Sequence, residues 1–170
     1  MSDQTDLAWL AGLIDGEGCL TFEIHKIYLR RGPFPKINLA FYLAVSPGLW
    51  QNKVTAIFIE YGIAYHQWIN QRNKIVRISV TSTKSVKILC NLIKDYSVIK
   101  KELVQRFLNY EGIGSGRRGT ESKVKQIAED LDYVRSFNRK KNIPYIWDGR
   151  KIMESFGFQK NSEQTVKGHA

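Results

Sequence analysis

Two carboxylates close a short apolar segment near the start of the chain, residues 10–18 (LAGLIDGEG). Apolar side chains recur at i, i+3, i+4 and i+7, which predicts a helix over residues 5–15 that ends at Gly16 and Gly18. Asp15 and Glu17 then lie at the negative end of the helix dipole. An acid there costs several tenths of a kcal/mol.

The same segment has little side-chain bulk. Ala8, Ala11 and Gly12 would let another backbone approach closely. If that backbone were the same helix of a second copy, two Glu17 carboxylates would converge and repel unless a cation lay between them. Oxygen ligands without nearby His or Cys favour Mg²⁺ over zinc. An ordinary amphipathic helix with a glycine cap and surface acids explains the same residues, and on this pattern alone it is the favoured interpretation.

The charge balance indicates a polyanionic partner. Lys and Arg number 26 against 16 Asp and Glu, which gives a net charge of +10 in 170 residues. The first 18 residues hold four acids and no base, so residues 19–170 carry +14. A basic body around a small acidic segment favours nucleic-acid binding; a merely solvated surface is the alternative.

Composition excludes several other classes of protein. Apolar residues make up 43%, enough for one packed domain. The longest apolar run, residues 39–45, is too short to cross a bilayer. Two cysteines and a polar, acidic start without a targeting signal predict an intracellular protein, in the cytoplasm or nucleoid of a prokaryote or in an organelle that encodes it.

Helix-spaced and alternating segments follow one another in a simple order. Strands are predicted over residues 19–28 and 37–45, joined by a basic turn at 30–35, and a hairpin over 64–70 and 74–81. Further helices are predicted over residues 49–61, from a Thr83 cap to about 95, and over 99–110 and 122–138. This order predicts an α+β fold, an antiparallel sheet with helices packed on one face.

Beyond this core, residues 112–119 form a glycine-rich basic loop and residues 139–158 a basic, aromatic tailpiece. We therefore expect one domain over residues 1–158, with a core at 5–110, a helical extension at 111–158 and a flexible tail at 159–170. The GxGxxG pattern at residues 114–119 follows no predicted strand, so a nucleotide-binding fold is not indicated.

The nine-residue segment LAGLIDGEG resembles the signature of the LAGLIDADG homing endonucleases. It differs at Gly16 and Glu17, where the family name has Ala and Asp. The αββαββα order of residues 5–110 is similar to that of the family; beyond residue 110 the likeness is weak. The resemblance implies a sheet that sits like a saddle on DNA, with helices behind it. A single motif per chain implies a homodimer formed through the motif helix.

The resemblance also implies an activity, a divalent-metal-dependent endodeoxyribonuclease. Such an enzyme cuts both strands of a long pseudo-palindromic site, leaves 3′ overhangs and promotes intron mobility. Mg²⁺ is the expected cofactor, Mn²⁺ a substitute, and Ca²⁺ an ion that binds without supporting cleavage. Two alternatives on the same scaffold are a splicing cofactor (maturase) that binds intron RNA and a non-cleaving DNA-binding regulator.

The resemblance also implies roles for individual residues, according to their positions in the motif and fold. Glu17 matches the acid that ligates metal, and the Gly16 carbonyl a backbone ligand. Lys100 matches a lysine near the scissile phosphate, with Lys101 as the alternative. Some relatives have a glutamine after the second strand, where this chain has Ser46. The dimer interface would include Ala8, Ala11, Gly12 and Asp15, the last bracing the helix ends.

In proteins similar to this one, the polar strand face reads base edges in the major groove while basic turns hold phosphates. Residues 19–82 carry eight bases and two acids, which fits this role. Of the four tryptophans, those at positions 50, 68 and 147 could be stacking platforms, but core packing or turn anchoring is the commoner reason for a tryptophan. The expected DNA-binding residues are Thr21, Glu23, His25, Lys26, Arg30, Arg31, Lys36, Asn38, Tyr42, Gln67, Arg72, Lys74, Arg77 and Ser79.

Overall fold

One antiparallel sheet organises the molecule, in the order β1-β2-β4-β3. The computed structural model describes residues 3–29, 32–113, 119–138 and 147–158. The strands are β1 (Cys19–Leu29), β2 (Gly32–Val45), β3 (His66–Ile69) and β4 (Val76–Val80). The helices are α1 (Gln4–Glu17), α2 (Leu49–Glu60), α3 (Thr83–Ile93), α4 (Lys101–Asn109), α5 (Glu121–Phe137) and α6 (Gly149–Ser155).

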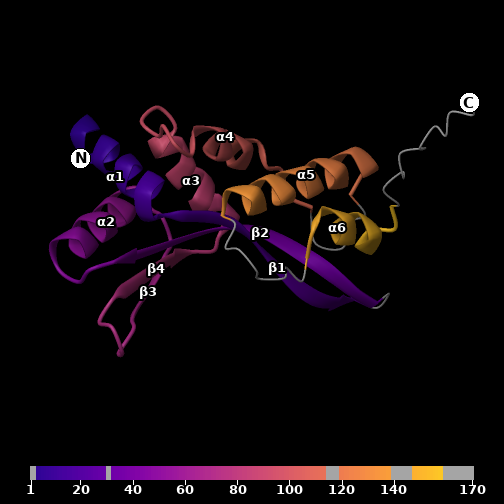
Figure 1. The fold of residues 1–170 in the computed structure, drawn as a ribbon, viewed down its shortest axis with the longest axis horizontal. Helices are drawn as coiled ribbons and strands as arrows, with labels where there is room; N and C mark the ends of the chain where they lie inside the picture. Colours follow the sequence, from indigo (N-terminus) through magenta and orange to yellow (C-terminus); the bar gives the residue numbers. More distant parts are fainter. Residues whose placement is uncertain (1–2, 30–31, 114–118, 139–146, 159–170) are drawn as a thin grey trace, which may run out of the picture.

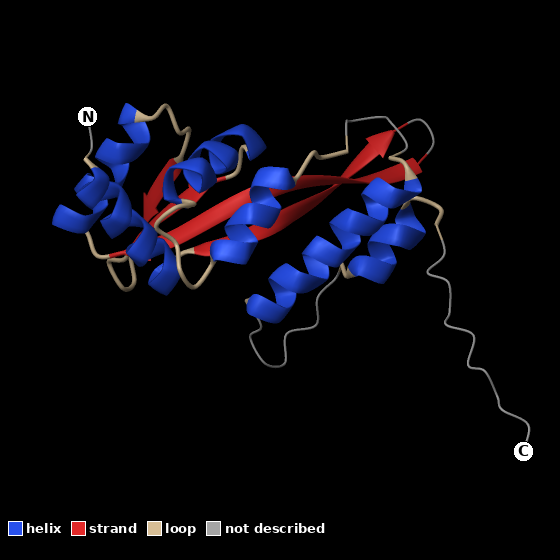
Figure 2. Ribbon diagram, turned by 90° about the horizontal axis from the view of Figure 1, so that it is seen from above, coloured by secondary structure: helices blue, strands red, loops and turns tan. Residues whose placement is uncertain are grey.

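The helices lie on one side of this sheet and leave the other side bare (Figure 1). Seen from above, the long β1–β2 hairpin runs beneath several helices (Figure 2). The helix-facing side carries the core, whose fully buried side chains include Leu20, Phe41 and Ile78 from the sheet and Leu89 and Phe107 from the helices. The predicted α+β class, with an antiparallel sheet covered on one face, is confirmed.

Strand register separates the two faces. Thr21 pairs with Ala40, Glu23 with Asn38 and His25 with Lys36, all on the bare face. The alternating residues, such as Leu20 and Phe41, pair on the core face. The β1–β2 hairpin is longer than predicted, because residues 32–35 pair with residues 26–29 instead of forming a turn. Arg30 and Arg31 lie outside the described residues.

Two local expectations are corrected. Gly16 does not end α1, which continues through Glu17; the helix ends at Gly18, whose N–H donates to the Ile14 carbonyl at 3.0 Å. Thr83 is not the cap of α3, because the N-cap is Ser82. The Thr83 hydroxyl instead accepts a hydrogen bond from the Leu39 N–H at 3.2 Å and so ties α3 to β2.

The helical extension after residue 110 packs on the long hairpin. α5 contacts β1, and α6 contacts both α5 and β2. The Asn138 amide donates to the Leu20 carbonyl at 2.8 Å. Sequence reasoning missed α6, a seven-residue helix whose N-cap, Asp148, accepts from the Lys151 N–H. Gly149 is needed there, because a Cβ would come within 2.4 Å of the Asp132 carboxylate.

Candidate active site and nucleic-acid interface

Asp15 is fastened into the protein by hydrogen bonds from a segment more than 80 residues away. Its carboxylate accepts from the Ser97 hydroxyl at 2.7 Å and from the N–H groups of residues 98, 99 and 100 at 2.7, 3.0 and 3.1 Å. Burial by itself would raise the pKa of this carboxyl, but the four donors outweigh it and hold the pKa below its usual value. Asp15 therefore fixes the segment before α4 against the end of α1.

Lys100 contacts the end of α1 in turn. Its side chain is 5% exposed, and its Nζ donates to the carbonyls of Ile14 (2.8 Å) and Asp15 at the C-terminus of α1. Burial lowers the pKa of the ammonium, while Asp15, Cys19 and Glu17 act in the opposite direction. A cation on the last carbonyls of a helix is favoured by the dipole. Asp15 and Lys100 thus form a reciprocal clasp between α1 and the start of α4.

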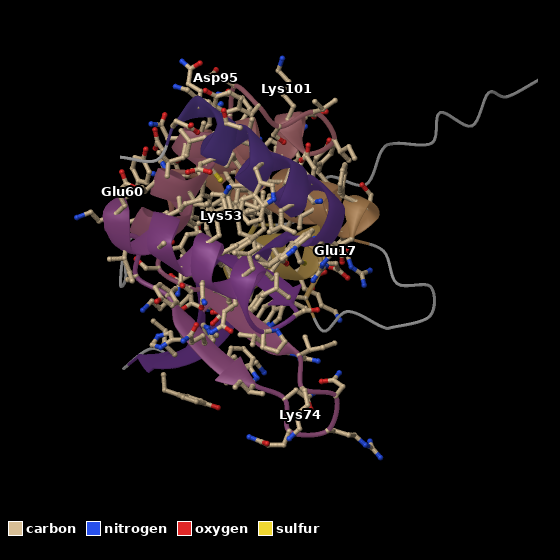
Figure 3. The ribbon with its side chains drawn as sticks, turned by 90° about the vertical axis from the view of Figure 1, so that its left-hand side faces the viewer. Glu17, Lys53, Glu60, Lys74, Asp95 and Lys101 are labelled. Carbon is tan, nitrogen blue, oxygen red and sulfur yellow. The ribbon has the colours of Figure 1, made fainter. Side chains whose placement is uncertain are left out.

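Glu17 differs from Asp15 in its exposure and in its hydrogen bonding. It is exposed, and within the described ranges no hydrogen bond or ion pair engages its carboxylate. Its side chain lines an open hollow of about 320 Å³ with Leu13, Ser46 and Trp50. Figure 3 shows the Lys101 side chain pointing away from Glu17, so Lys100 and not Lys101 lies at this end of α1. Ser46, which follows β2 where some relatives have a glutamine, is thus one of the residues that line the hollow.

One stripe of α1 is bare. Ala8 and Gly12 are exposed, and a Cβ added at Gly12 or Gly16 would meet no atom within 4 Å. Ala11 does not belong to this stripe, which corrects the expectation for it: the side chain is 0% exposed and packs in the hydrophobic core of the chain. Asp15 is likewise 8% exposed, and the segment it braces belongs to its own chain.

Oxygen donors remain available at the end of α1. An α-helix leaves its last four carbonyls without intrahelical partners. Lys100 takes those of Ile14 and Asp15, so the Gly16 carbonyl is the next one beside the Glu17 carboxylate. Both are the hard donors that Mg²⁺ prefers, so these residues fit the ion. Among the residues that the structure describes, no three His, Cys, Asp or Glu are grouped to hold a metal.

The bare face of the sheet carries a linked group of polar side chains. The Tyr42 hydroxyl donates to Glu23 Oε1, and His25 Nε2 lies 3.2 Å from Glu23 Oε2. Because the Tyr42 bond spans the Thr21–Ala40 pair, Ala40 is fully buried although it lies on this face. Lys36 is exposed and Asn38 half-buried beside them. The structure thus brings Thr21, Glu23, His25, Lys36, Asn38 and Tyr42 together.

Two of the expected DNA-binding residues lie on the other face of the sheet. Lys26 shares the core-side parity of Leu20, Phe22 and Ile24, and its Nζ lies 6.0 Å from the ring centre of Trp147. Gln67 pairs with Ile78 on the core side, and its amide oxygen lies 3.5 Å from the Gln51 amide of α2. Neither residue belongs to the bare face, and the expectation that both bind DNA stays a prediction.

The β3–β4 hairpin supplies the other end of the bare face. Arg77 is exposed there, whereas Ser79 lies on the same face but is 5% exposed, covered by its neighbours. Arg72 and Lys74 are exposed at the turn, where Lys74 adopts a positive φ of 57° and its Nζ donates to the Gln71 side chain. These cations stand where a hairpin tip could meet phosphate.

Sequence reasoning missed two residues of this face. His66 and Trp68 pair with Ser79 and Arg77, so they share the bare side of the sheet. Trp68 is 46% exposed, so core packing, one of the two commoner explanations given from the sequence, does not apply to it. The alternation of side chains along the strands, counted from Arg77, would have placed His66 and Trp68 on the bare face. Trp68 was not assigned to it because a tryptophan is more often buried.

Comparison with solved structures places this architecture among known folds. An archaeal intron-encoded homing endonuclease, I-Vdi141I, complexed with DNA, is similar with a TM-score of 0.68 and 15% identity over 92% of this chain and 97% of that one. I-CvuI, with its target in the presence of 2 mM Ca, gives 0.60 and 17% over 91% and 96%. The LAGLIDADG meganuclease I-AabMI, bound to uncleaved DNA, gives 0.51 and 17% over 89% of this chain and 56% of that chain.

The chain has the LAGLIDADG homing-endonuclease fold. The resemblance seen in residues 10–18 is thus confirmed for the fold. A scan against family models and a search of curated proteins found no match. None of the helices in the described part of this LAGLIDADG fold has the length and hydropathy to span a membrane.

Proposed function

We propose that this chain is a site-specific, metal-dependent DNA endonuclease that acts as a homodimer. The observation that carries the proposal is Glu17, an exposed carboxylate without a hydrogen-bonding partner among the described residues, at the open end of a helix held rigidly by Asp15 and Lys100. Among the described residues the Glu17 carboxylate has no partner to stabilise, yet it extends from a fixed helix end beside the Gly16 carbonyl oxygen. Such a group is suited to binding a ligand and not to stabilising the fold.

The bare stripe of α1 is the proposed contact between two copies. Ala8, Gly12 and Gly16 follow at intervals of four residues, so they share one face of the helix. Small residues allow two helix backbones to approach closely. A two-fold axis along this stripe would bring the Glu17 of each copy to one centre, where the two carboxylates would share bound metal ions.

Each residue of the end of α1 has a task in this proposal. The Glu17 carboxylate and the Gly16 carbonyl hold the ion, and Lys100 holds the helix end that carries them while adding positive charge near the phosphate. A bound Mg²⁺ supplies a water of lowered pKa and neutralises phosphate charge. We expect Mn²⁺ to replace it, and Ca²⁺ to bind without supporting cleavage.

The bare face of the sheet would lie in the major groove of each half of a long pseudo-palindromic site. Side chains from both hairpins then read base edges, and the exposed cations at the β3–β4 turn hold phosphates. Cutting both strands with 3′ overhangs at an intron-less copy of the host gene would promote intron mobility inside the compartment that encodes the chain.

The test uses a supercoiled plasmid carrying the flanking gene without its intron. We expect one double-strand cut with Mg²⁺ or Mn²⁺, none with EDTA or Ca²⁺, and 3′ overhangs when the ends are sequenced. The Glu17→Gln variant should bind the same plasmid without cutting it. Binding of intron RNA without any cut in the plasmid would contradict the proposal and support a splicing cofactor; binding of the plasmid without any cut would support a regulator.

A further inference from the structure

A single carboxylate lies among the cations and neutral polar groups of the bare sheet face. Of the described strand residues on that face, only Glu23 is acidic. It lies opposite Asn38 and is followed on the same face by the cross-strand pair His25–Lys36. A negative charge weakens attraction to phosphates. The negative charge of Glu23 therefore does not suit a phosphate contact.

The Glu23 carboxylate is held in place by two neighbours and still has hydrogen-bond acceptor positions without a partner among them. Tyr42 engages Oε1 and His25 engages Oε2, while a carboxylate offers about four acceptor positions. The Glu23 side chain keeps 23% of its surface exposed, so acceptor positions remain open to a ligand. Burial, together with the bond to Glu23, raises the pKa of Tyr42 further above neutral pH, where its hydroxyl is a donor.

A carboxylate discriminates among bases because it can only accept hydrogen bonds. In the major groove, cytosine presents the N4 amino donor, whereas guanine presents O6 and N7 and thymine presents O4, all acceptors. Adenine places an acceptor, N7, beside its N6 donor. Cytosine is thus the base that best matches a fixed Glu side chain, and guanine at the same place is repelled.

We infer that Glu23 selects cytosine at one position in each half of the DNA target, with Tyr42 as the positioning residue that fixes its carboxylate. The inference rests on the proposed function, since it requires the bare sheet face to lie in the major groove. Glu23 lies four residues beyond Cys19, where β1 begins, about 13 Å along the extended strand.

A simpler role for Glu23 is to hold Tyr42 over Ala40. That role needs one oxygen of Glu23 and gives no base preference. The two roles are separated by substitutions that keep the size of the side chain. Glu23→Gln retains an acceptor oxygen but adds an amide that pairs with the N6 and N7 of adenine. Tyr42→Phe removes the donor to Glu23 and leaves the ring over Ala40.

The experiment selects bound duplexes from a random DNA pool with Ca²⁺ present and sequences them for four proteins: wild type, Glu23→Gln, Tyr42→Phe and Glu129→Gln. The last is a matched control, because Glu129 is exposed on α5, away from the bare sheet face, and loses the same charge. Thermal melting of each variant verifies that it is folded.

We expect the wild type to enrich a two-fold symmetric motif with one cytosine column per half that Glu129→Gln leaves unchanged. In Glu23→Gln that column alone should shift to adenine, and in Tyr42→Phe it should weaken. On fixed duplexes, the wild-type preference for cytosine over adenine there should be about tenfold or more and should be lost in Glu23→Gln.

Two results would separate the role of Glu23 from the proposed function. A symmetric motif with the same columns in wild type and Glu23→Gln would overturn the inference and leave the proposed function intact. A wild-type pool that enriches no motif would overturn both.

Discussion

Asp15 and Glu17 are acids two residues apart at the end of one helix, yet they have opposite environments. Asp15 is buried and accepts four hydrogen bonds from residues 97–100, whereas Glu17 is exposed and makes none with the described residues. Folding therefore uses one acid and leaves the other available. The difference indicates that the loss of Asp15 should affect stability and that the loss of Glu17 should affect chemistry.

The largest expected effect separates the two acids by activity. Glu17→Gln should lower the rate of DNA cleavage by about 1000-fold or more, because metal binding supplies several kcal/mol of charge stabilisation. Its free energy of unfolding should stay within about 0.5 kcal/mol of wild type, since the side chain is exposed. Single-turnover cleavage and urea unfolding measure the two quantities. A variant that cuts normally would remove Glu17 from the active site.

The reverse pattern is expected for Asp15→Asn. The amide keeps one acceptor oxygen and turns an NH₂ group toward backbone donors, so the free energy of unfolding should fall by about 2–4 kcal/mol. Urea unfolding at 20 °C checks the value, with Asp95→Asn, on an exposed acid, as the control. If Asp15→Asn were as stable as wild type, the clasp would not contribute to folding as described.

The two neighbouring lysines extend the comparison at smaller scale. Lys100→Met removes the donor to the Ile14 and Asp15 carbonyls and should cost about 1–3 kcal/mol of stability. Lys101→Met, on an exposed side chain that points away from Glu17, should change stability by less than about 0.5 kcal/mol (Figure 3). Equal losses in the two variants would contradict the assignment of the clasp to Lys100.

The smallest effect is a pH dependence. The pKa of Asp15 is lower in the folded chain than in the unfolded one, where it is about 3.9. Its contribution to stability is therefore complete above that value and is lost as the pH falls through the folded pKa. The stability difference between wild type and Asp15→Asn should be constant from pH 6 to pH 8 and should shrink below about pH 4. A constant difference down to pH 2 would show that the pKa is not lowered.

Local patterns were enough to predict the layout of the fold. The helical spacing before Glu17 and the alternation in residues 19–28 and 37–45 are short-range signals, and the structure contains the elements they predict. Strand parity also places Lys26 and Gln67 on the core side of the sheet, although both are among the expected DNA-binding residues. Ala11 shares the spacing of Leu7 and Ile14, which already pointed to the core.

The clasp could not be predicted from local sequence. Asp15 and its donors are separated by more than 80 residues, and nothing near either segment indicates that they meet. The same holds for Glu23 and Tyr42, whose contact depends on the register between two strands. Chemistry that depends on such long-range pairs appears only once the fold is known.

The central claim is that two copies unite their Glu17 side chains at one centre on DNA. Native mass spectrometry of the full chain on a duplex selected from the random pool counts the chains in the complex directly. The account predicts two chains per duplex, and a shift toward one chain when Gly12→Leu fills the bare stripe of α1. One wild-type chain per duplex, at every protein concentration at which the duplex is bound, would contradict it.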